Sequence, residues 1–178
     1  DTFVANRNIF GKVYFPRLVT PISILISNMI TFAIQFLMFL GFLIHFISRG
    51  YNVQITIYAL LLPVFVFLMA GLSLGFGIIV SSMTTKYRDL RFLVTFGVQL
   101  WMYATPVIYP VSAIPENWRW VATVNPITPV VEGFRFAFLG AGKMSWGMLG
   151  YSFIFMIVVL LIGTLLFNRV EQTFMDTI

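Results

Sequence analysis

Residues 55–83 read ITIYALLLPVFVFLMAGLSLGFGIIVSSM, a run of 29 residues (83 − 55 + 1) without Asp, Glu, Lys or Arg. A helix of this length measures about 43 Å at about 1.5 Å per residue, whereas a hydrocarbon core about 30 Å thick needs only about 20 residues. The run therefore predicts a membrane-spanning helix that tilts, bends at Pro63 or projects from the bilayer.

The rest of the chain has the same apolar character. Of its 178 residues, 60% are hydrophobic and 10% are charged, whereas soluble domains carry about a quarter charged residues. Three further runs are long enough to span, at residues 22–47, 92–109 and 146–167. The sequence thus predicts an all-α membrane protein with four transmembrane helices in a single transmembrane domain.

Residues 110–145 differ from the four runs. Prolines interrupt this segment at positions 110, 115, 126 and 129, and its apolar stretches are short. Such lengths predict a short re-entrant or interfacial helix pair rather than a fifth span. Trp118 and Trp120 suit a position at the membrane interface.

The formal charge of +5 comes from 11 basic and 6 acidic residues. The basic residues cluster at the ends of the apolar runs, which favours membrane topology over a nucleic-acid partner. Seven of them fall on the side of residues 1–21 and 168–178, and four on the other side, so we expect both termini in the cytoplasm and 110–145 in the periplasm. The chain begins with Asp1 and lacks a signal-peptide pattern, and we expect a fragment of a longer protein.

Several kinds of chemistry are excluded by what the sequence lacks. There is no Cys, and the single His45 cannot form a multi-histidine metal site. No predicted span has a charged residue in its middle, which argues against a proton- or sodium-coupled carrier with a carboxylate relay. Lys143 is followed by Met144, so the phosphate-binding loop G-x-x-x-x-G-K-[ST] is absent. We expect no catalytic residue, no metal and no cofactor in this chain.

Two predicted spans carry polar faces. Six polar residues of the first span fall within an arc of about 140° at the helical period, and they are Ser23, Ser27, Asn28, Thr31, Gln35 and His45. Such a face serves either hydrogen-bonded helix packing or the lining of a pathway. The third span carries a mixed polar and aromatic face, which suits either sugar stacking or membrane anchoring. The candidate channel-lining residues are Ser27, Thr31, Gln35, Gln99, Trp101, Tyr103 and Tyr109.

Two further spacings predict local packing. Gly71 and Gly75 form a GxxxG pattern, with Gly77 nearby, which permits close approach of another helix. Glu132 and Arg135 are three positions apart, so they can pair on a short helix. That pair either fixes a loop helix or holds a gate closed.

Five motifs, in order along the whole chain, resemble the type-2 ABC transporter permeases that export polysaccharides such as O-antigen, capsule and teichoic acid. They are Lys12-Val-Tyr-Phe-Pro-Arg17, Tyr87-Arg88-Asp89, Thr105-Pro-Val-Ile-Tyr-Pro110, Asn125-Pro126 with Glu132 and Arg135, and Glu171 with Phe174 and Asp176. Such permeases usually have six spans. The resemblance therefore implies that two spans lie outside this sequence.

The resemblance also implies function. It implies a permease subunit in the bacterial inner membrane that passes lipid-linked polysaccharide, such as the O-antigen of lipopolysaccharide, from the cytoplasm to the periplasm or cell surface. A second permease copy would complete the channel, and a separate ABC ATPase subunit would bind ATP and Mg. Membrane lipid surrounds the protein, and no nucleic acid takes part.

Two sets of site residues follow from the same resemblance. Residues 6–18 would be the coupling segment that docks into the ATPase, although a basic segment resting on anionic lipid is the alternative. Residues 112–139 would gate the periplasmic exit. The candidate coupling residues are Arg7, Phe10, Lys12, Tyr14, Phe15 and Arg17, and the candidate gate residues are Trp118, Asn125, Pro126, Glu132 and Arg135.

Three other functions stay in consideration. A type-2 ABC permease for a drug or small lipid would share the same features. A membrane-embedded glycosyltransferase usually groups charged residues at one site, whereas the six acidic residues here are scattered. A structural anchor has no need for polar faces within its spans.

Overall fold

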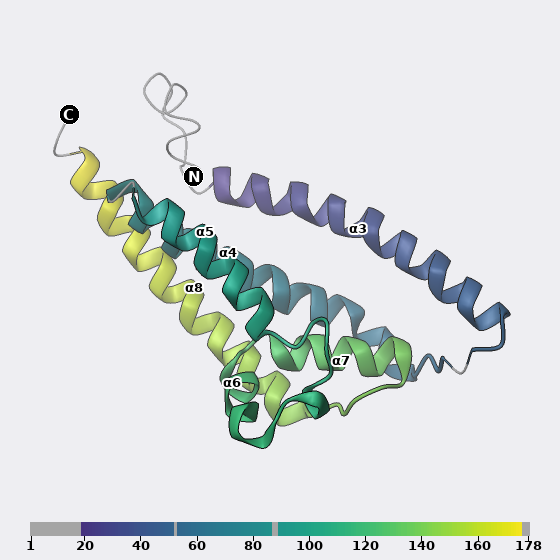
Figure 1. The fold of residues 1–178 in the computed structure, drawn as a ribbon. Helices are drawn as coiled ribbons and strands as arrows, with labels where there is room; N and C mark the ends of the chain where they lie inside the picture. The colour runs from purple at the N-terminus through teal and green to yellow at the C-terminus, as the bar shows by residue number, and fades with distance from the viewer. Residues whose placement is uncertain (1–18, 52, 87–88, 176–178) are drawn as a thin grey trace.

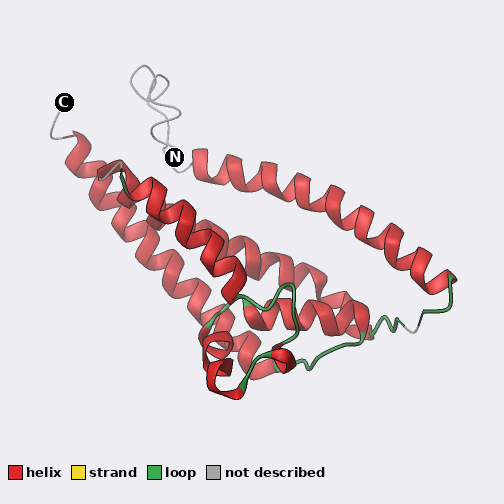
Figure 2. Cartoon of the chain, in the orientation of Figure 1, coloured by secondary structure: helices red, strands yellow, loops and turns green. Residues whose placement is uncertain are grey.

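The computed structural model describes residues 19–51, 53–86 and 89–175, and every regular element in these ranges is a helix (Figure 2). The all-α prediction is therefore confirmed. The long helices are α3 (Val19–Ser48), α4 (Leu62–Lys86), α5 (Leu90–Ala104) and α8 (Trp146–Met175). The shorter ones are η1 (Ile57–Leu61), η2 (Val111–Ala113), η3 (Glu116–Trp118), α6 (Arg119–Val124) and α7 (Thr128–Leu139).

Three of the four predicted spans are long and apolar enough to cross a membrane. Their apolar helical stretches run over Pro21–Ser48, Ile57–Thr84 and Trp146–Arg169. In the second stretch, η1 leads directly into α4, and Pro63 is the second residue of α4. A proline is tolerated in the first turn because the amide there has no helical partner. Pro63 therefore marks the start of α4.

The remaining predicted span, 92–109, is too long. Helix α5 has 15 residues and ends at Ala104, so residues 105–109 are not helical. Thr105 has extended backbone angles (φ −87°, ψ 130°), as expected for a residue that precedes a proline, here Pro106. At about 1.5 Å per residue, α5 is about 22 Å long and shorter than a hydrocarbon core of about 30 Å.

The helices form a bundle with two distinct ends (Figure 1). Helix α3 begins and α8 ends at one of them, which we call the terminal end. The opposite end, which we call the loop end, holds the connections 49–56 and 105–145. Helices α4 and α8 pack against each other, α5 lies against α4, and α3 stands off from the rest over much of its length.

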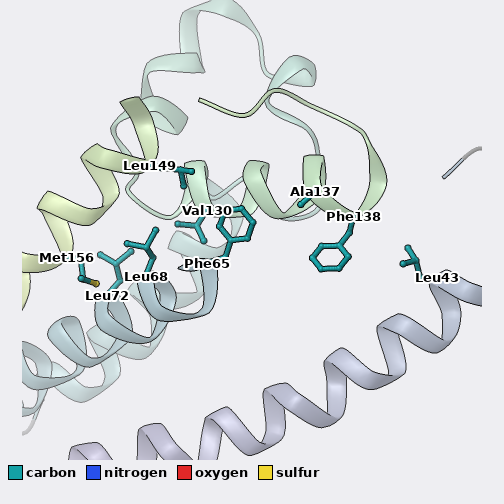
Figure 3. Packing of buried hydrophobic residues seen from close by; sticks show 9 residues of the cluster. All are labelled: Leu43, Phe65, Leu68, Leu72, Val130, Ala137, Phe138, Leu149 and Met156. Carbon is teal, nitrogen blue, oxygen red and sulfur yellow. The ribbon is translucent and has the colours of Figure 1, made fainter. Parts of the chain in front are cut away.

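The apolar core lies where α4, α7 and α8 meet, near the loop end (Figure 3). Phe65 and Leu68 of α4 face Val130 of α7, and Met156 of α8 closes the cluster. Gly133 makes room for this packing, because a Cβ there would lie 2.9 Å from the Phe65 ring. Helix α7 is thus part of the core.

Glycines bring α4 and α8 into close contact, and we call this contact the glycine seam. A Cβ on Gly75 would lie 2.8 Å from Val159 Cγ1 and 3.2 Å from the Leu160 amide nitrogen. A Cβ on Gly163 would lie 3.0 Å from the Gly75 carbonyl oxygen. A Cβ on Gly77 would meet no atom of a neighbouring helix within 4 Å. The predicted close approach is confirmed, with Gly77 outside it.

Candidate gate at the loop end

Helix α7 starts inside the bundle and ends at its surface. At its C-terminal end, the Ala137 carbonyl accepts hydrogen bonds from the Thr56 amide (2.9 Å) and the Thr56 hydroxyl (3.0 Å). Thr56 directly precedes the apolar stretch that begins at Ile57. Gly140 then ends the helix in the left-handed conformation (φ 66°). This end of α7 therefore lies level with the start of a membrane span.

The junction between α6 and α7 lies deeper. The Tyr151 hydroxyl donates to the Val124 carbonyl (2.7 Å), and the Ser152 hydroxyl donates to the Pro126 carbonyl (2.7 Å). Ser152 is six positions past Trp146, about 9 Å along α8 at about 1.5 Å per residue. The pair α6 and α7 thus descends into the span of α8 and returns, which favours the re-entrant form of the predicted pair.

The end of α5 is fixed to this junction by a buried polar contact. The Asn125 side-chain amide donates to the Thr105 hydroxyl (2.8 Å), and that hydroxyl donates to the Trp101 carbonyl (2.9 Å). The Asn125 side-chain oxygen accepts from the Ile127 amide (3.0 Å). Both side chains are buried. A buried hydrogen bond between side chains therefore joins the residue that follows α5 to the residue that follows α6.

Arg135 supplies donors to the non-helical backbone after α5. Its guanidinium donates to the carbonyls of Val107 (2.9 Å), Pro106 (3.2 Å) and Tyr109 (3.4 Å). Unpaired carbonyls at membrane depth are costly, and a guanidinium carries five donors in a fixed fork. We call this set of contacts, together with Glu132, the carbonyl clamp.

Glu132 completes the clamp. Its Oε1 accepts from Arg135 at 2.8 Å and from the Val111 amide at 3.4 Å. The two side chains are only 15% and 13% exposed, so each charge depends on the other for compensation. The predicted pairing is confirmed, and its role in a gate stays a prediction.

The remaining candidate gate residues fall into two groups. Asn125 and Pro126 are buried at the junction described above. Trp118 is 63% exposed, as is Trp120. Between them, Arg119 forms a surface ion pair with Glu116 (3.4 Å). The tryptophans of η3 and α6 therefore face outward, whereas Asn125 and Pro126, which follow α6, are buried.

The polar face of α3 points away from the other helices. Ser27, Thr31 and Gln35 are all exposed, and the Thr31 hydroxyl bonds within the helix to the Ser27 carbonyl (3.2 Å). The packed side of α3 includes Phe36 and Leu43. At about 100° per residue, the centres of the two faces are about 140° apart. The described helices therefore leave this polar face uncovered.

The candidate channel-lining residues of the third predicted span lie in different environments. Gln99 and Tyr103 are exposed on α5. Trp101 instead meets the Phe76 ring of α4 edge to face, with centroids 4.8 Å apart. Tyr109 lies beyond the helix, and its hydroxyl donates to the Tyr103 carbonyl (2.7 Å). The structure thus keeps Gln99 and Tyr103 on one open face and places Trp101 in helix packing.

All six candidate coupling residues lie outside the described residues, and so do Tyr87 and Arg88. Of the resemblance motifs, the structure brings together Thr105–Pro110 with the Asn125, Glu132 and Arg135 group. Sequence reasoning missed Tyr151 and Ser152, which hold the junction to α8. A hydroxyl residue in an apolar span was the available signal, because such groups often bond to a neighbouring helix.

Comparison with known proteins finds a matching family and several relatives of this chain. The sequence profile described as ABC-2 type transporter matches residues 1–139. Two proteins from Klebsiella pneumoniae, each named O-antigen export system permease protein RfbA, are 28% and 26% identical over 182 and 175 residues. Each alignment covers 98% of this chain and 66% of the relative. A protein of the same name from Myxococcus xanthus is 27% identical over 135 residues, 75% of this chain and 50% of the relative. The chain thus spans slightly less than two thirds of its Klebsiella relatives.

Proposed function

Because the chain belongs to the ABC-2 type transporter family, we propose that it is the permease subunit of an ATP-driven exporter that moves lipid-linked polysaccharide across the bacterial inner membrane. Relatives named O-antigen export permeases align with nearly the whole chain, which supports this class of substrate. The protein makes multiple passes through the membrane, and the loop end faces the periplasm.

The observation that carries the proposal is the broken backbone of residues 105–111, which lies in the chain between two stretches, 57–84 and 146–169, that are long and apolar enough to span a membrane. Non-helical backbone at membrane depth is tolerated only where protein buries it or where it borders a water-filled cavity. Here the carbonyl clamp and the contact between Asn125 and Thr105 supply its hydrogen bonds. A hydrophilic polymer needs polar groups at its exit, and we assign residues 112–139 to the gate there.

The exposed polar faces suit a sugar polymer. Ser27, Thr31 and Gln35 on α3, and Gln99 and Tyr103 on α5, offer hydroxyl, amide and aromatic groups. Aromatic rings pack on apolar surface while polar groups beside them take up hydrogen bonds. We assign these two faces to the wall of the channel, which a second copy of the permease completes.

Energy comes from a separate ABC ATPase subunit that binds ATP and Mg. Residues 6–18 form the coupling segment that docks into it, because aromatic anchors and arginines dominate interface energetics. Replacing both Phe15 and Arg17 by Ala in the full-length protein is expected to weaken copurification of the ATPase at least tenfold, with membrane insertion unchanged. Equal copurification from the variant and the parent would remove this assignment.

The proposal is tested by complementation. The full-length permease and its ATPase are expressed in a strain that lacks its own polysaccharide export permease, and surface polysaccharide is measured by gel and antibody. We expect surface polysaccharide to return, and to be lost again when the ATPase carries a substitution that abolishes hydrolysis. Absence of surface polysaccharide despite normal membrane levels of both subunits would contradict the proposal.

The same strains distinguish polysaccharide export from the second candidate function, export of a drug or small lipid. A permease for a drug or small lipid would raise drug tolerance or change lipid composition without restoring surface polysaccharide. Both quantities are measured in parallel with the gel. Restored polysaccharide with unchanged drug tolerance supports glycan export.

A further inference from the structure

The connection between α7 and α8, residues 140–145, folds back along α7. Gly142 in this connection has a positive φ of 96°, which glycine adopts readily. It lies beside Glu132, although Glu132 is seven positions (139 − 132) before Leu139, the last residue of α7. Seven residues of helix measure about 10 Å at about 1.5 Å per residue. The connection therefore returns from the end of α7 toward the carbonyl clamp (Figure 1).

The Glu132 carboxylate lies against the backbone of Gly142. A Cβ on residue 142 would be 2.6 Å from Glu132 Oε2 and 3.7 Å from Glu132 Cδ. The first distance is shorter than real Cβ atoms show in folded proteins. Any residue other than glycine at this position must therefore displace either the carboxylate or the connection.

A surface carboxylate would move aside at little cost, but the Glu132 carboxylate is held in place. Its Oε1 accepts hydrogen bonds from Arg135 (2.8 Å) and from the Val111 amide (3.4 Å). Both oxygens lie off the axis of the Cγ–Cδ bond, so a rotation that takes Oε2 away from residue 142 also takes Oε1 away from its donors. The side chain is only 13% exposed, so little water is at hand to replace those bonds. The space at Gly142 and the hydrogen bonds of Oε1 are therefore linked.

We propose that Gly142 is a positioning residue for the carbonyl clamp. Because it lacks a Cβ, Oε2 can lie against the connection while Oε1 holds the Arg135 guanidinium and the Val111 amide. Arg135 is then placed to donate to the carbonyls of residues 106, 107 and 109. The segment that leads into α8 thus sets the position of the groups that satisfy the backbone after α5. The meaning of Gly142 for export rests on the proposed function, whereas its contact with Glu132 does not.

The test is a double-mutant cycle between positions 142 and 132 in the full-length permease. Gly142→Ala adds a single methyl group. Glu132→Asp keeps the negative charge but shortens the side chain by one methylene, which withdraws the carboxylate from residue 142. We expect Gly142→Ala to lower export at least fivefold in the parent and less than twofold in the Glu132→Asp background. The midpoint of thermal unfolding in detergent is expected to show the same dependence.

Gly50→Ala is the matched control for backbone strain. Gly50 also has a positive φ (80°), but a Cβ there would meet no atom within 4 Å. We expect Gly50→Ala to lower the midpoint by the same small amount in the parent and in the Glu132→Asp background. If Gly142→Ala also lowered the midpoint equally in both backgrounds, its loss would arise in the connection itself, and the positioning role would be overturned.

Two further outcomes are decisive. A Gly142→Ala variant that exports and unfolds like the parent would also overturn the positioning role. If Gly142→Ala does not accumulate in the membrane, its level is compared with and without Glu132→Asp: restored accumulation supports the positioning role, and equally low levels overturn it.

The positioning role and the proposed function fail separately. Thermal unfolding needs no transport, so the cycle tests the contact between Gly142 and Glu132 whether or not the parent restores surface polysaccharide. Absence of export from the parent, with the unfolding midpoints as expected, would contradict the proposed function alone.

Discussion

The glycine seam and the carbonyl clamp both hold helices together at close range, but they use opposite means. In the seam, Gly75 and Gly163 let two backbones touch without side-chain polar groups. In the clamp, Arg135 and Glu132 provide hydrogen bonds to backbone that no helix satisfies. In lipid there is no hydrophobic driving force between apolar helices. The seam therefore depends on close van der Waals packing of the two backbones. Charged groups are expensive within lipid unless they are paired, and the clamp pairs them where the helix of α5 is interrupted.

The largest effect is expected from breaking the clamp on one side. Arg135→Met leaves the Glu132 charge without its basic partner and removes the side-chain donor of three carbonyls. Removing one member of a buried pair costs about 3–5 kcal/mol, and the slight exposure of this pair places the loss near about 3 kcal/mol. Thermal unfolding in detergent measures it. The exposed Arg119→Met variant is the control, since surface pairs contribute about 0–1 kcal/mol.

Replacing both charged residues of the clamp separates the cost of the unpaired carboxylate from the cost of the carbonyls that lack donors. In Glu132→Leu with Arg135→Met, no buried charge remains, but the carbonyls still lack donors. We expect this double variant to be more stable than Arg135→Met alone and less stable than the parent. If the double variant were as unstable as the single one, the cost would lie in the carbonyls rather than in the unpaired carboxylate.

A somewhat smaller effect is expected in the seam. Gly75→Leu drives a side chain into Val159 and the Leu160 backbone, and overpacking of this kind costs about 1–3 kcal/mol. Gly77→Leu is the matched control because its Cβ has open space. The midpoint of thermal unfolding is expected to fall for the first variant and to stay near the parent value for the second. Equal midpoints would show that α4 and α8 separate easily.

Asn125→Ala is expected to cost less, about 1–2 kcal/mol, because it removes the donor to Thr105 and the acceptor for the Ile127 amide. A double-mutant cycle with Thr105→Val isolates the contact between the two side chains. We expect a coupling of about 1 kcal/mol. A coupling near zero would mean that the end of α5 is held by the carbonyl clamp alone.

The smallest effect is expected at the surface. Glu116→Gln removes the exposed ion pair with Arg119, whose contribution is within about 1 kcal/mol. Arg119 keeps its hydrogen bond to the Ile114 carbonyl (3.1 Å). Stability and export of this variant should match the parent, and a large loss of export at normal stability would give the outer surface of the gate a role of its own.

Local features were predictable from the sequence. The apolar runs predicted the three helical stretches that are long enough to span a membrane, the spacing of Gly71 and Gly75 predicted the close approach, and the i,i+3 spacing predicted the pair of Glu132 and Arg135. Each of these depends on residues within one helix. Pro106 also carried enough information to shorten α5, because it disfavours helix at Thr105.

Contacts between distant segments were not predictable in the same way. The Arg135 guanidinium reaches carbonyls 26 to 29 positions earlier in the chain. Trp101 was grouped with Gln99 and Tyr103 by sequence proximity, whereas the structure turns it toward Phe76. Both outcomes depend on how α5 and α7 lie in the bundle, and no local periodicity contains that information.

The short length of α5 has a consequence for the barrier that the bilayer presents. A molecule that travels beside α5 is next to regular helix for about 22 Å, whereas a full hydrocarbon core is about 30 Å thick. Acyl chains next to this helix must shorten or disorder to match it, as with any hydrophobic mismatch. Lipid in contact with α5 is therefore expected to form a thinner barrier than lipid in contact with α3 or α8.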